Sequence, residues 1–356
     1  MAATFTAFFV PGVKALCLRL GLIDSPDKRK QHRSPMVRLG GVAMIFGFCC
    51  ALTITWLIGG FGLLPPLKDQ LIWTTLAGGL CFFLIGLADD LFALPPFPRL
   101  IGQVSIAMAI WSQGLRIGAI EMPWLGEESS LMVLPPLLSL ISTVIWLVGI
   151  TNAINWLDGL DGLAAGVAGI AAIGLISVSF SLHQVAAGFL AAALAGCCLG
   201  FLRHNFNPAR IFMGDGGSYF LGFTLAAISI IGPAKGLTTV SLLLPLLILS
   251  LPLADMSAVI MSRLREGRSP FHPDRSHIHH RLLRAGFSHR KTVLLLYAFT
   301  QWLGALALVV ANAEMRFLWL TVATAILITA VLLSRKELID SRKTNQPLNT
   351  TSPRVK

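Results

Sequence analysis

Long apolar runs, separated by short polar segments, dominate the hydrophobic pattern of this chain. Most runs approach the roughly 20 residues that a helix needs to cross a bilayer. They predict eleven transmembrane helices, at about 4–23, 39–60, 71–88, 98–115, 131–150, 162–182, 185–202, 216–233, 237–260, 292–311 and 317–334. Pro11, Lys14 and Arg19 interrupt the first run, so residues 1–23 could instead lie in the membrane interface, which leaves ten spans. The pattern predicts an all-α polytopic membrane protein, with one catalytic domain at 1–334 and a flexible cytoplasmic tail at 335–356.

Composition and charge agree with this class and give the chain an orientation. Of 356 residues, 55% are hydrophobic and 13% charged, and the mean hydropathy is +0.74. One set of alternate loops holds 22 of the 28 Lys and Arg residues, so this set is predicted to be cytoplasmic. The net charge of +11 fits attraction either to anionic lipid or to anionic substrates. All six cysteines lie in predicted spans without a CxxC pair, and no Walker loop or dinucleotide fingerprint occurs.

Aspartates cluster at the ends of the apolar runs, where a carboxylate is costly in free energy. Asp89 and Asp90 end the third span, and adjacent carboxylates repel each other unless a cation lies nearby. Asp215 stands among three glycines before a new helix, where backbone N–H groups suit a phosphate and the carboxylate suits a hard cation. The alternatives are an ordinary polar helix end for the pair and an N-cap role for Asp215.

The segment NAINWLDGLDGLAAG at 152–166 is more specific. Asn152, Asn155, Asp158 and Asp161 recur at intervals of three, so neighbouring members share a helix face. Across all four positions an ideal helix rotates by half a turn, so the outer pair converges only if the segment is tightened or broken. Helix packing alone does not account for four amide and carboxylate side chains at a membrane boundary.

A basic, His-rich segment at 265–286 combines a turn with a predicted short helix. One face of this helix is expected to carry His277, His280, Arg281 and Arg284, while His279 points elsewhere. The HxHH pattern lacks a Cys or carboxylate at familiar zinc spacing, and Arg neighbours repel a metal. Arg and His together suit a diphosphate better. A basic juxtamembrane loop is the alternative.

Taken together, these sequence motifs resemble those of the bacterial polyprenyl-phosphate N-acetylhexosamine-1-phosphate transferases of glycosyltransferase family 4. The motifs that carry the resemblance are KRKQHRSPMVRLGG at 28–41, GLADD at 86–90, the segment at 152–166, FMGDGGSYFLGF at 212–223 and GRSPFHPDRSHIHHRLL at 267–283. Members of this family transfer a sugar 1-phosphate from a UDP-sugar to a lipid phosphate, usually undecaprenyl phosphate, with Mg²⁺ or Mn²⁺, and release UMP. The RLGG and DRSHIHHRL versions look like the UDP-GlcNAc branch, which starts O-antigen, common-antigen or teichoic-acid assembly. The resemblance implies an active site on the cytoplasmic face of the bacterial inner membrane.

The resemblance also assigns expected roles to individual residues. The expected metal ligands are Asp215 and Asp90, and the expected catalytic residues are Asp89, Asp90, Asp158, Asp161, His277 and His280. Substrate contacts are expected from Lys28, Arg29, His32, Arg38, Arg99, Asn152, Asn155, Asn205, Arg268, His279 and Arg281. Arg99 departs from the family, which usually has Lys there. A phosphate monoester, with a second pKa of about 6, is largely deprotonated near neutral pH, which favours metal-binding and positioning roles for Asp89 over proton abstraction.

Other readings remain open at this point. The peptidoglycan branch of the family uses UDP-MurNAc-pentapeptide and typically carries a different His-rich loop. A secondary transporter would place its ionisable residues near mid-membrane, whereas these acids lie at span ends. An intramembrane prenyltransferase would use aspartates with Mg²⁺ but would need paired Asp-rich motifs. The expected partners are a UDP-sugar, undecaprenyl phosphate and membrane lipid, without nucleic acid. A homodimer, the exact sugar and a covalent aspartyl intermediate are left open.

Overall fold

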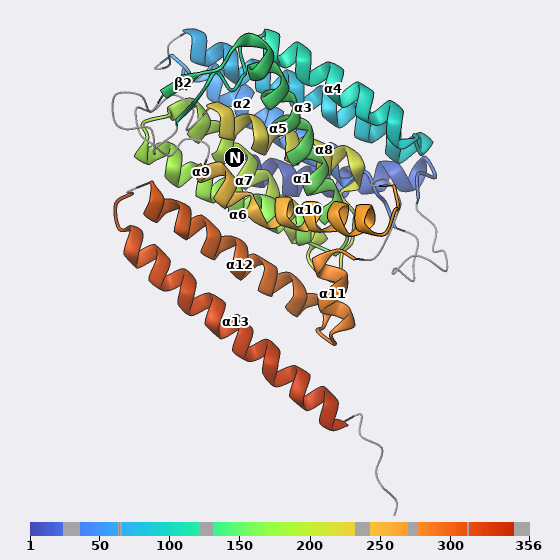
Figure 1. The fold of residues 1–356 in the computed structure, drawn as a ribbon. Helices are drawn as coiled ribbons and strands as arrows, with labels where there is room; N and C mark the ends of the chain where they lie inside the picture. The colour runs from blue at the N-terminus through green and yellow to red at the C-terminus, as the bar shows by residue number, and fades with distance from the viewer. Residues whose placement is uncertain are drawn as a thin grey trace, which may run out of the picture.

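The computed structural model describes residues 1–23, 36–62, 64, 66–121, 131–231, 243–269, 276–311 and 313–344, which form a bundle of helices with one small β-hairpin (Figure 1). The helices are α1 (Ala2–Arg19), α2 (Gly40–Leu57), α3 (Pro66–Phe92), α4 (Pro96–Ser112), α5 (Pro136–Leu157), α6 (Leu163–Ser181), α7 (Val185–Asn205), α8 (Gly214–Ile231), α9 (Leu243–Ile248), α10 (Ser250–Arg265), α11 (Ile278–Arg284), α12 (His289–Val310) and α13 (Arg316–Thr344). The strands are β1 (Ala119–Glu121) and β2 (Leu131–Val133), which pair antiparallel with Ile120 opposite Met132.

Among the described residues, nine helices are long and apolar enough to cross a membrane. They are α1, α2, α3, α5, α6, α7, α8, α12 and α13. The predicted class, an all-α polytopic membrane protein, is confirmed. The first apolar run, whose place was open, is a helix that packs against α2 and α7. All six cysteines lie within helices, as the sequence predicted, and all six are free thiols.

The structure differs from the predicted spans in four places. The span expected at 98–115 forms α4, which has 17 residues and is not among the nine helices. The span expected at 237–260 is broken at Leu249 into α9 and α10, and each of these helices has a proline in its first turns, Pro245 and Pro252. Proline has no N–H to donate and is tolerated mainly where a helix begins, so two starts replace one continuous span. The span expected from 131 begins with β2, and α5 starts at Pro136. Finally, α13 continues to Thr344, past the boundary predicted at 334.

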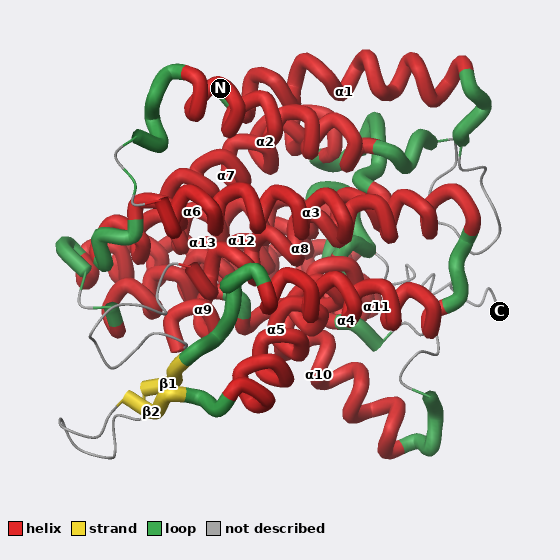
Figure 2. Tube along the Cα trace, turned by 90° about the horizontal axis from the view of Figure 1, so that it is seen from above, coloured by secondary structure: helices red, strands yellow, loops and turns green. Residues whose placement is uncertain are grey.

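Helix α8 forms the centre of the bundle, since every residue from Gly216 to Ile231 is buried. It packs against α3, α5 and α2 (Figure 2). Gly86 of α3 faces Asp215 at the start of α8, while Gly78 of α3 faces Phe223 two turns further on, so the two helices run antiparallel. The C-terminal end of α3 therefore lies beside the N-terminal end of α8, and small residues allow this close approach.

Helix α5 also runs antiparallel to α8, because its Thr151 lies against Gly222 while Asn155 contacts Ser218. The last turns of α3 and α5 and the first turn of α8 consequently meet at one end of the bundle. The β-hairpin lies at the opposite end from α11 (Figures 1 and 2). This arrangement brings polar segments that are far apart in the sequence into one place.

Candidate active site

The ends of three helices bring Asp89, Asp215 and Arg99 together. Asp89 lies in the last turn of α3, Asp215 in the first turn of α8, and Arg99 in the first turn of α4. A Cβ added to Gly86 would lie 2.3 Å from the carbonyl oxygen of Asp215, so only glycine allows α3 to approach α8 this closely. Asp89 and Asp90, which end one predicted span, and Asp215, which precedes another, thus lie together in the structure.

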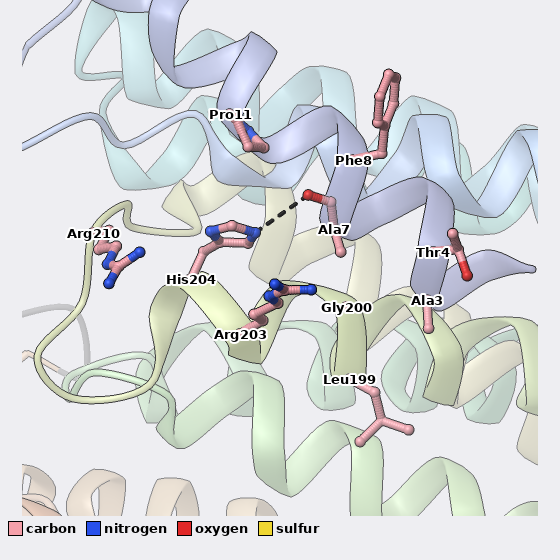
Figure 3. Close-up of a pocket in the computed structure, with 10 residues that line it drawn as sticks. All are labelled: Ala3, Thr4, Ala7, Phe8, Pro11, Leu199, Gly200, Arg203, His204 and Arg210. Carbon is pink, nitrogen blue, oxygen red and sulfur yellow. Dashed lines mark hydrogen bonds between the residues drawn. The ribbon is translucent and has the colours of Figure 1, made fainter.

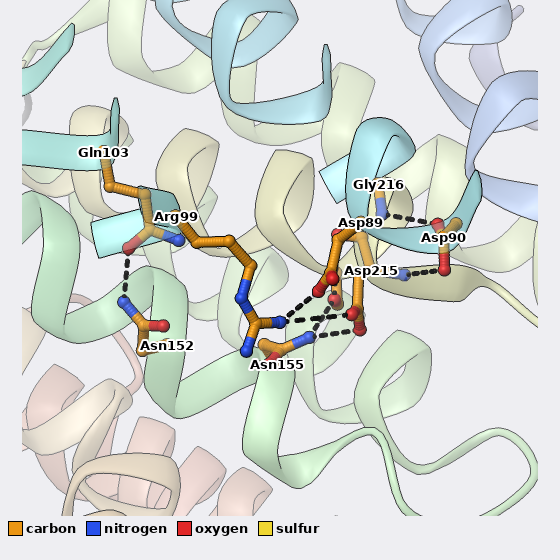
Figure 4. A network of polar contacts seen from close by, with 9 residues as sticks. Asp89, Asp90, Arg99, Gln103, Asn152, Asn155, Asp215 and Gly216 are labelled. Carbon is orange, nitrogen blue, oxygen red and sulfur yellow. Dashed lines mark hydrogen bonds and ion pairs between the residues drawn. The ribbon is translucent and has the colours of Figure 1, made fainter. Parts of the chain in front are cut away.

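Asp90 caps helix α8. Its two carboxylate oxygens accept the backbone N–H groups of Asp215 and Gly216, each at 2.9 Å (Figure 4). Gly214 makes the turn into the helix with φ +77°, and a Cβ there would lie 2.1 Å from the carbonyl oxygen of Arg38 and 2.5 Å from Asp90. A carboxylate at a helix N-terminus is stabilised by unpaired N–H groups and by the helix dipole. The cap that the sequence offered as an alternative role for Asp215 is supplied by Asp90, whose predicted role as a metal ligand stays a prediction.

Arg99 lies between the two remaining carboxylates. Its guanidinium forms an ion pair with Asp89 and lies 3.7 Å from an oxygen of Asp215 (Figure 4). Asn155 donates hydrogen bonds to Asp215 at 2.7 Å and to Ser218 at 2.9 Å, which fixes the Asp215 side chain. One cation therefore faces two carboxylates held by separate helices, and the predicted side chains Asp89, Asp215, Arg99 and Asn155 form one cluster.

Asn152 does not join this cluster. Its amide donates to Gln103 of α4 at 2.7 Å and to the carbonyl oxygen of Val148 at 2.8 Å (Figure 4). The four residues at intervals of three are separated because α5 ends at Leu157 and the chain turns before α6, with Gly162 at φ +80°. The break in the helix that the sequence required is thus observed, although it sends the outer pair in different directions.

Asp161 and Asn205 hold backbone together. Asp161 accepts hydrogen bonds from the amide of Asn207 and the backbone N–H of Ala209, both at 3.0 Å. Asn205, buried at 3% exposure, accepts the N–H of Gly162 at 3.0 Å. These bonds fix the loop between α7 and α8 against the turn between α5 and α6. The structure shows a structural role for both side chains, and their catalytic and substrate-binding roles stay predictions.

Asp158 differs from the other acids because its carboxyl makes no hydrogen bond to the described residues. It follows α5 directly and is half-buried. Burial raises the pKa of this carboxyl to about 7, with further raising by the charges of Asp90 and Asp161 against the opposing charge of Arg38. Asp158 can therefore bind or release a proton near neutral pH.

The His-rich segment lies against the end of α5. Nδ1 of His277 is 2.9 Å from a carboxylate oxygen of Asp255 on α10, and the other oxygen of Asp255 accepts the N–H of Ile278 at 2.7 Å. The His277 ring also meets Trp156 edge to face. Two basic side chains of α11, Arg281 and Arg284, are exposed.

The single face predicted for the histidines is wrong. His277 precedes α11 with an extended ψ of 150°, so helical spacing does not relate it to His280. Its ring stacks on that of His279 with centroids 5.6 Å apart. His279, expected to point away, is 1% exposed and packs over Gly159, where a Cβ would lie 2.3 Å from its Nε2. Burial lowers the pKa of His279 to about 3, aided by the nearby His280 and His277.

Several predicted substrate contacts have other positions. Lys28, Arg29 and His32 lie outside the described residues. Arg38 is exposed, and its charge acts on both Asp90 and Asp158. Arg268 is half-exposed and forms an ion pair with Glu266.

Sequence reasoning missed Asp255, although a signal for it existed. This acid is 8% exposed and lies within the apolar run predicted as the span 237–260, where an ionisable residue is a candidate for function. Gln103, the partner of Asn152, carried no comparable signal.

The carboxylate cluster has the donors that a hard divalent cation prefers. Asp89 and Asp215 offer carboxylate oxygens, and Asn155 holds the Asp215 carboxylate in place by donating a hydrogen bond to it. Within the described part of the chain, no group of three or more His, Cys, Asp or Glu side chains could hold a metal ion alone. Mg²⁺ commonly binds one or two carboxylates and completes its shell with water and substrate phosphates. The cluster therefore fits a metal that the substrate helps to hold.

Comparison with known proteins identifies the family. Residues 72–233 match the glycosyl transferase family 4 profile. The chain is 34% identical to a probable undecaprenyl-phosphate N-acetylglucosaminyl 1-phosphate transferase of Bacillus subtilis, over 87% of this chain and 82% of that protein. It is 36% identical to the decaprenyl-phosphate N-acetylglucosaminephosphotransferase of Mycobacterium tuberculosis H37Rv, over 88% of this chain and 80% of the relative. It is 33% identical to an undecaprenyl-phosphate alpha-N-acetylglucosaminyl 1-phosphate transferase of Salmonella typhi, over 82% of this chain and 77% of that relative. This chain, a multi-pass membrane protein whose polar helix ends meet in one site, belongs to glycosyl transferase family 4.

Proposed function

We propose that this protein transfers GlcNAc 1-phosphate from UDP-GlcNAc to undecaprenyl phosphate, releasing UMP, at the cytoplasmic face of a bacterial inner membrane. The observation that carries the proposal is the cluster of Asp89, Arg99, Asn155 and Asp215 at the meeting point of four helix ends. The names of the relatives support the sugar, since each refers to N-acetylglucosamine and to a polyprenyl phosphate. They favour this donor over UDP-MurNAc-pentapeptide.

The reaction joins two anions, so the site has to offset their repulsion. An oxygen of the lipid phosphate attacks the phosphorus that carries the sugar, the bond between the two phosphates of UDP-GlcNAc breaks, and UMP leaves with its electron pair. The attacking phosphate is largely a dianion near neutral pH and needs no general base. Catalysis then depends on positioning and on charge placed where the phosphates meet.

The residues of the cluster supply much of that charge and positioning. Arg99 faces both Asp89 and Asp215, and its guanidinium can also bind a phosphate oxygen. Asn155 holds Asp215 in a fixed orientation. Asp255 engages Nδ1 of His277, so Nε2 is the ring atom that can donate to a diphosphate oxygen when the imidazole carries both protons.

We further propose that Mg²⁺, or Mn²⁺ in its place, is the cofactor, held by Asp89 and Asp215 together with substrate phosphates. When bound, the ion would neutralise the phosphates and polarise the diphosphate. The all-oxygen donor set supports this choice over a soft metal.

The cytoplasmic orientation rests on the distribution of basic residues. The segments that approach the cluster belong to the loop set that holds 22 of the 28 Lys and Arg residues. The carboxylates also lie at helix ends instead of at mid-helix, which favours an enzyme acting at the membrane surface over a secondary transporter. A homodimer stays a prediction.

The test uses the full-length protein, purified in detergent and supplied with undecaprenyl phosphate and Mg²⁺. Labelled UDP-GlcNAc, UDP-GalNAc and UDP-MurNAc-pentapeptide are compared as donors. We expect a labelled lipid product and one UMP per turnover with UDP-GlcNAc. Transfer from UDP-MurNAc-pentapeptide without transfer from UDP-GlcNAc would assign the chain to the peptidoglycan branch, and no lipid product from any donor would contradict the proposal.

A further inference from the structure

A cavity of about 990 Å³ lies between α1 and α7, lined by none of the residues of the carboxylate cluster (Figure 3). Helix α1 contributes Ala3, Ala7, Phe8 and Pro11 to its wall. Helix α7 and the segment that follows it contribute a second wall that ends in three basic side chains, Arg203, His204 and Arg210. The cavity thus has an apolar part along the two helices and a basic end.

The two helices are held at a fixed spacing on either side of this space. At Gly200 the backbones are in contact, since a Cβ there would lie 2.3 Å from the carbonyl oxygen of Ala3. One turn further along α7, Nε2 of His204 lies 3.2 Å from the carbonyl oxygen of Ala7 (Figure 3). The space between them is therefore part of the packed structure of the bundle.

Within the part of the chain that the structure describes, no negative charge compensates the basic end. No acidic side chain lines the cavity, and Arg203 and Arg210 are exposed and form no ion pair with the described residues. Arg203, Arg210 and Lys14 are all close enough for their charges to act on the His204 ring. Cations gathered in this way repel each other, so an anion bound among them would lower the free energy of the site.

The apolar part of the cavity is placed to contact the acyl chain of a lipid. Phe8 is 74% exposed and Leu199 is 57% exposed, on helices that are apolar and long enough to cross a membrane. Such side chains face hydrocarbon when the protein is in a bilayer. Arg203 and His204 lie in the last turn of α7, where a spanning helix reaches the lipid headgroups. A basic pocket at this depth between membrane helices matches the phosphate of a lipid headgroup.

We propose that the cavity between α1 and α7 binds one anionic phospholipid, with its phosphate between Arg203 and Arg210 and one acyl chain along Phe8 and Leu199. This site is separate from the transfer site, because the acceptor phosphate has to reach Asp89 and Asp215 and the cavity contains neither. Phosphatidylglycerol has the required charge and shape, whereas phosphatidylcholine carries no net charge.

Native mass spectrometry of the delipidated full-length protein tests the proposal. Phosphatidylglycerol is titrated into the wild type, the double variant R203A/R210A and the charge-retaining variant R203K/R210K. We expect one phosphatidylglycerol per chain at saturation. The apparent Kd should rise by at least roughly 10- to 150-fold in R203A/R210A, the range for loss of one charge-assisted contact, because this variant removes two such contacts. R203K/R210K should stay within about 5-fold of the wild type, since it retains the charges. Arg335→Ala, which removes an exposed arginine of α13 outside the cavity, should bind as the wild type does.

Three results would overturn the proposal. Phosphatidylcholine bound as tightly as phosphatidylglycerol would show that charge is not recognised, and displacement of the lipid by millimolar inorganic phosphate would show a site for a soluble anion. A raised KM for undecaprenyl phosphate in R203A/R210A would make the cavity part of the acceptor site.

If R203A/R210A fails to fold, Leu199→Trp provides a second, independent test. Its indole fills the apolar part, and it should weaken phosphatidylglycerol binding while leaving helical content unchanged, whereas unchanged binding would contradict the proposed chain position.

Discussion

The carboxylate of Asp255 contacts both the His277 ring and the backbone at the start of α11. One carboxylate oxygen lies 2.9 Å from Nδ1 of His277, and the other accepts the N–H of Ile278 at 2.7 Å. Both partners are buried, at 8% exposure each. A carboxylate on Nδ1 fixes the orientation of an imidazole and keeps the proton on that nitrogen, so Nε2 is directed elsewhere. Asp255 is therefore a positioning residue for His277.

Asp255→Asn should lower kcat/KM for the UDP-sugar by roughly 10- to 150-fold, the range for loss of one charge-assisted contact. The amide oxygen can still accept the N–H of Ile278, so helix α11 should remain capped and the fold retained. Steady-state kinetics together with the thermal unfolding temperature measure the two effects. Because positioning acts on the bound diphosphate, we expect the acceptor KM to change less than the donor KM.

Glu314→Gln is the matched control, since Glu314 is an exposed acid in the turn just before α13. It should leave kcat/KM within about 2-fold of the wild type, as expected for surface substitutions. A fall in unfolding temperature without any loss of kcat/KM in Asp255→Asn would reduce Asp255 to a purely structural role.

Gly86→Ala should separate α3 from α8. The added Cβ would lie 2.3 Å from the carbonyl oxygen of Asp215, which is backbone and cannot move aside cheaply. We expect a loss of about 1–3 kcal/mol in the free energy of unfolding, the usual range for overpacking. Transfer activity should fall more steeply, because Asp89 and Asp215 are carried by the two helices that are pushed apart.

Gly149→Ala provides the comparison for this variant. Gly149 also lies within a membrane helix, but a Cβ there meets nothing within 4 Å. It should be neutral or slightly stabilising, because alanine is the better helix former. Equal effects of the two substitutions would show that helix propensity, and not the contact with Asp215, accounts for the change.

The sequence predicted the class of the fold and most of its helices, because hydrophobic runs long enough to span a bilayer leave few alternatives. It did not predict the break at Leu249, since Asp255 is the only charged residue in the long hydrophobic run from 237 to 260. The prolines at 245 and 252 carried the signal, but whether a proline kinks a helix or starts a new one depends on packing. The β-hairpin was absent from the prediction because its strands have three residues each.

The residues of the site were predicted better than their roles. Asp89, Asp90 and Asp215 were grouped correctly because each ends or begins a predicted span. The use of Asp90 as a cap for α8 could not be predicted, since the residues it joins are about 125 positions apart in the sequence. The prediction of one shared face in the His-rich segment was wrong for a local reason. Helical spacing was applied to His277, which stands just outside the helix.

Arg99→Gln should change metal and acceptor dependence in opposite directions. The guanidinium faces Asp89 and Asp215, the two carboxylates proposed to hold Mg²⁺, so its removal makes the local charge more negative. A unit charge at about 4 Å is worth roughly 1–4 kcal/mol between water and an effective dielectric constant of 20. We therefore expect the half-saturating Mg²⁺ concentration to fall at least about 5-fold, while the KM for undecaprenyl phosphate rises.

Arg99→Lys separates charge from geometry in this experiment. It retains one cation but loses the planar guanidinium, whose Nη1 lies near both carboxylates, so it should restore the wild-type Mg²⁺ dependence more fully than the wild-type kcat. Transfer that continues in EDTA would contradict the metal proposal itself. An unchanged Mg²⁺ dependence in Arg99→Gln would show only that Arg99 and the ion do not share these carboxylates.

The last prediction concerns stability at acidic pH and depends on His279. Burial lowers the pKa of this histidine to about 3, so the folded protein keeps it neutral, while the unfolded chain protonates it near pH 6.5. The contribution of the neutral His279 to the free energy of unfolding is therefore complete above about pH 6.5. It is lost as the pH falls from there toward 3, because the unfolded state then binds more protons. At pH 5 the loss amounts to about 2 kcal/mol. The charged or titratable groups that act on the ring are His277, His280, His289 and Asp255.

His279→Gln should lower stability at pH 7.5 through lost packing, yet reduce the further loss between pH 7.5 and pH 5, as measured by thermal unfolding in detergent. His183→Gln, at an exposed histidine, should keep the wild-type slope. If His279→Gln and the wild type lose the same stability over this pH range, another group titrates and the buried neutral imidazole is not the cause.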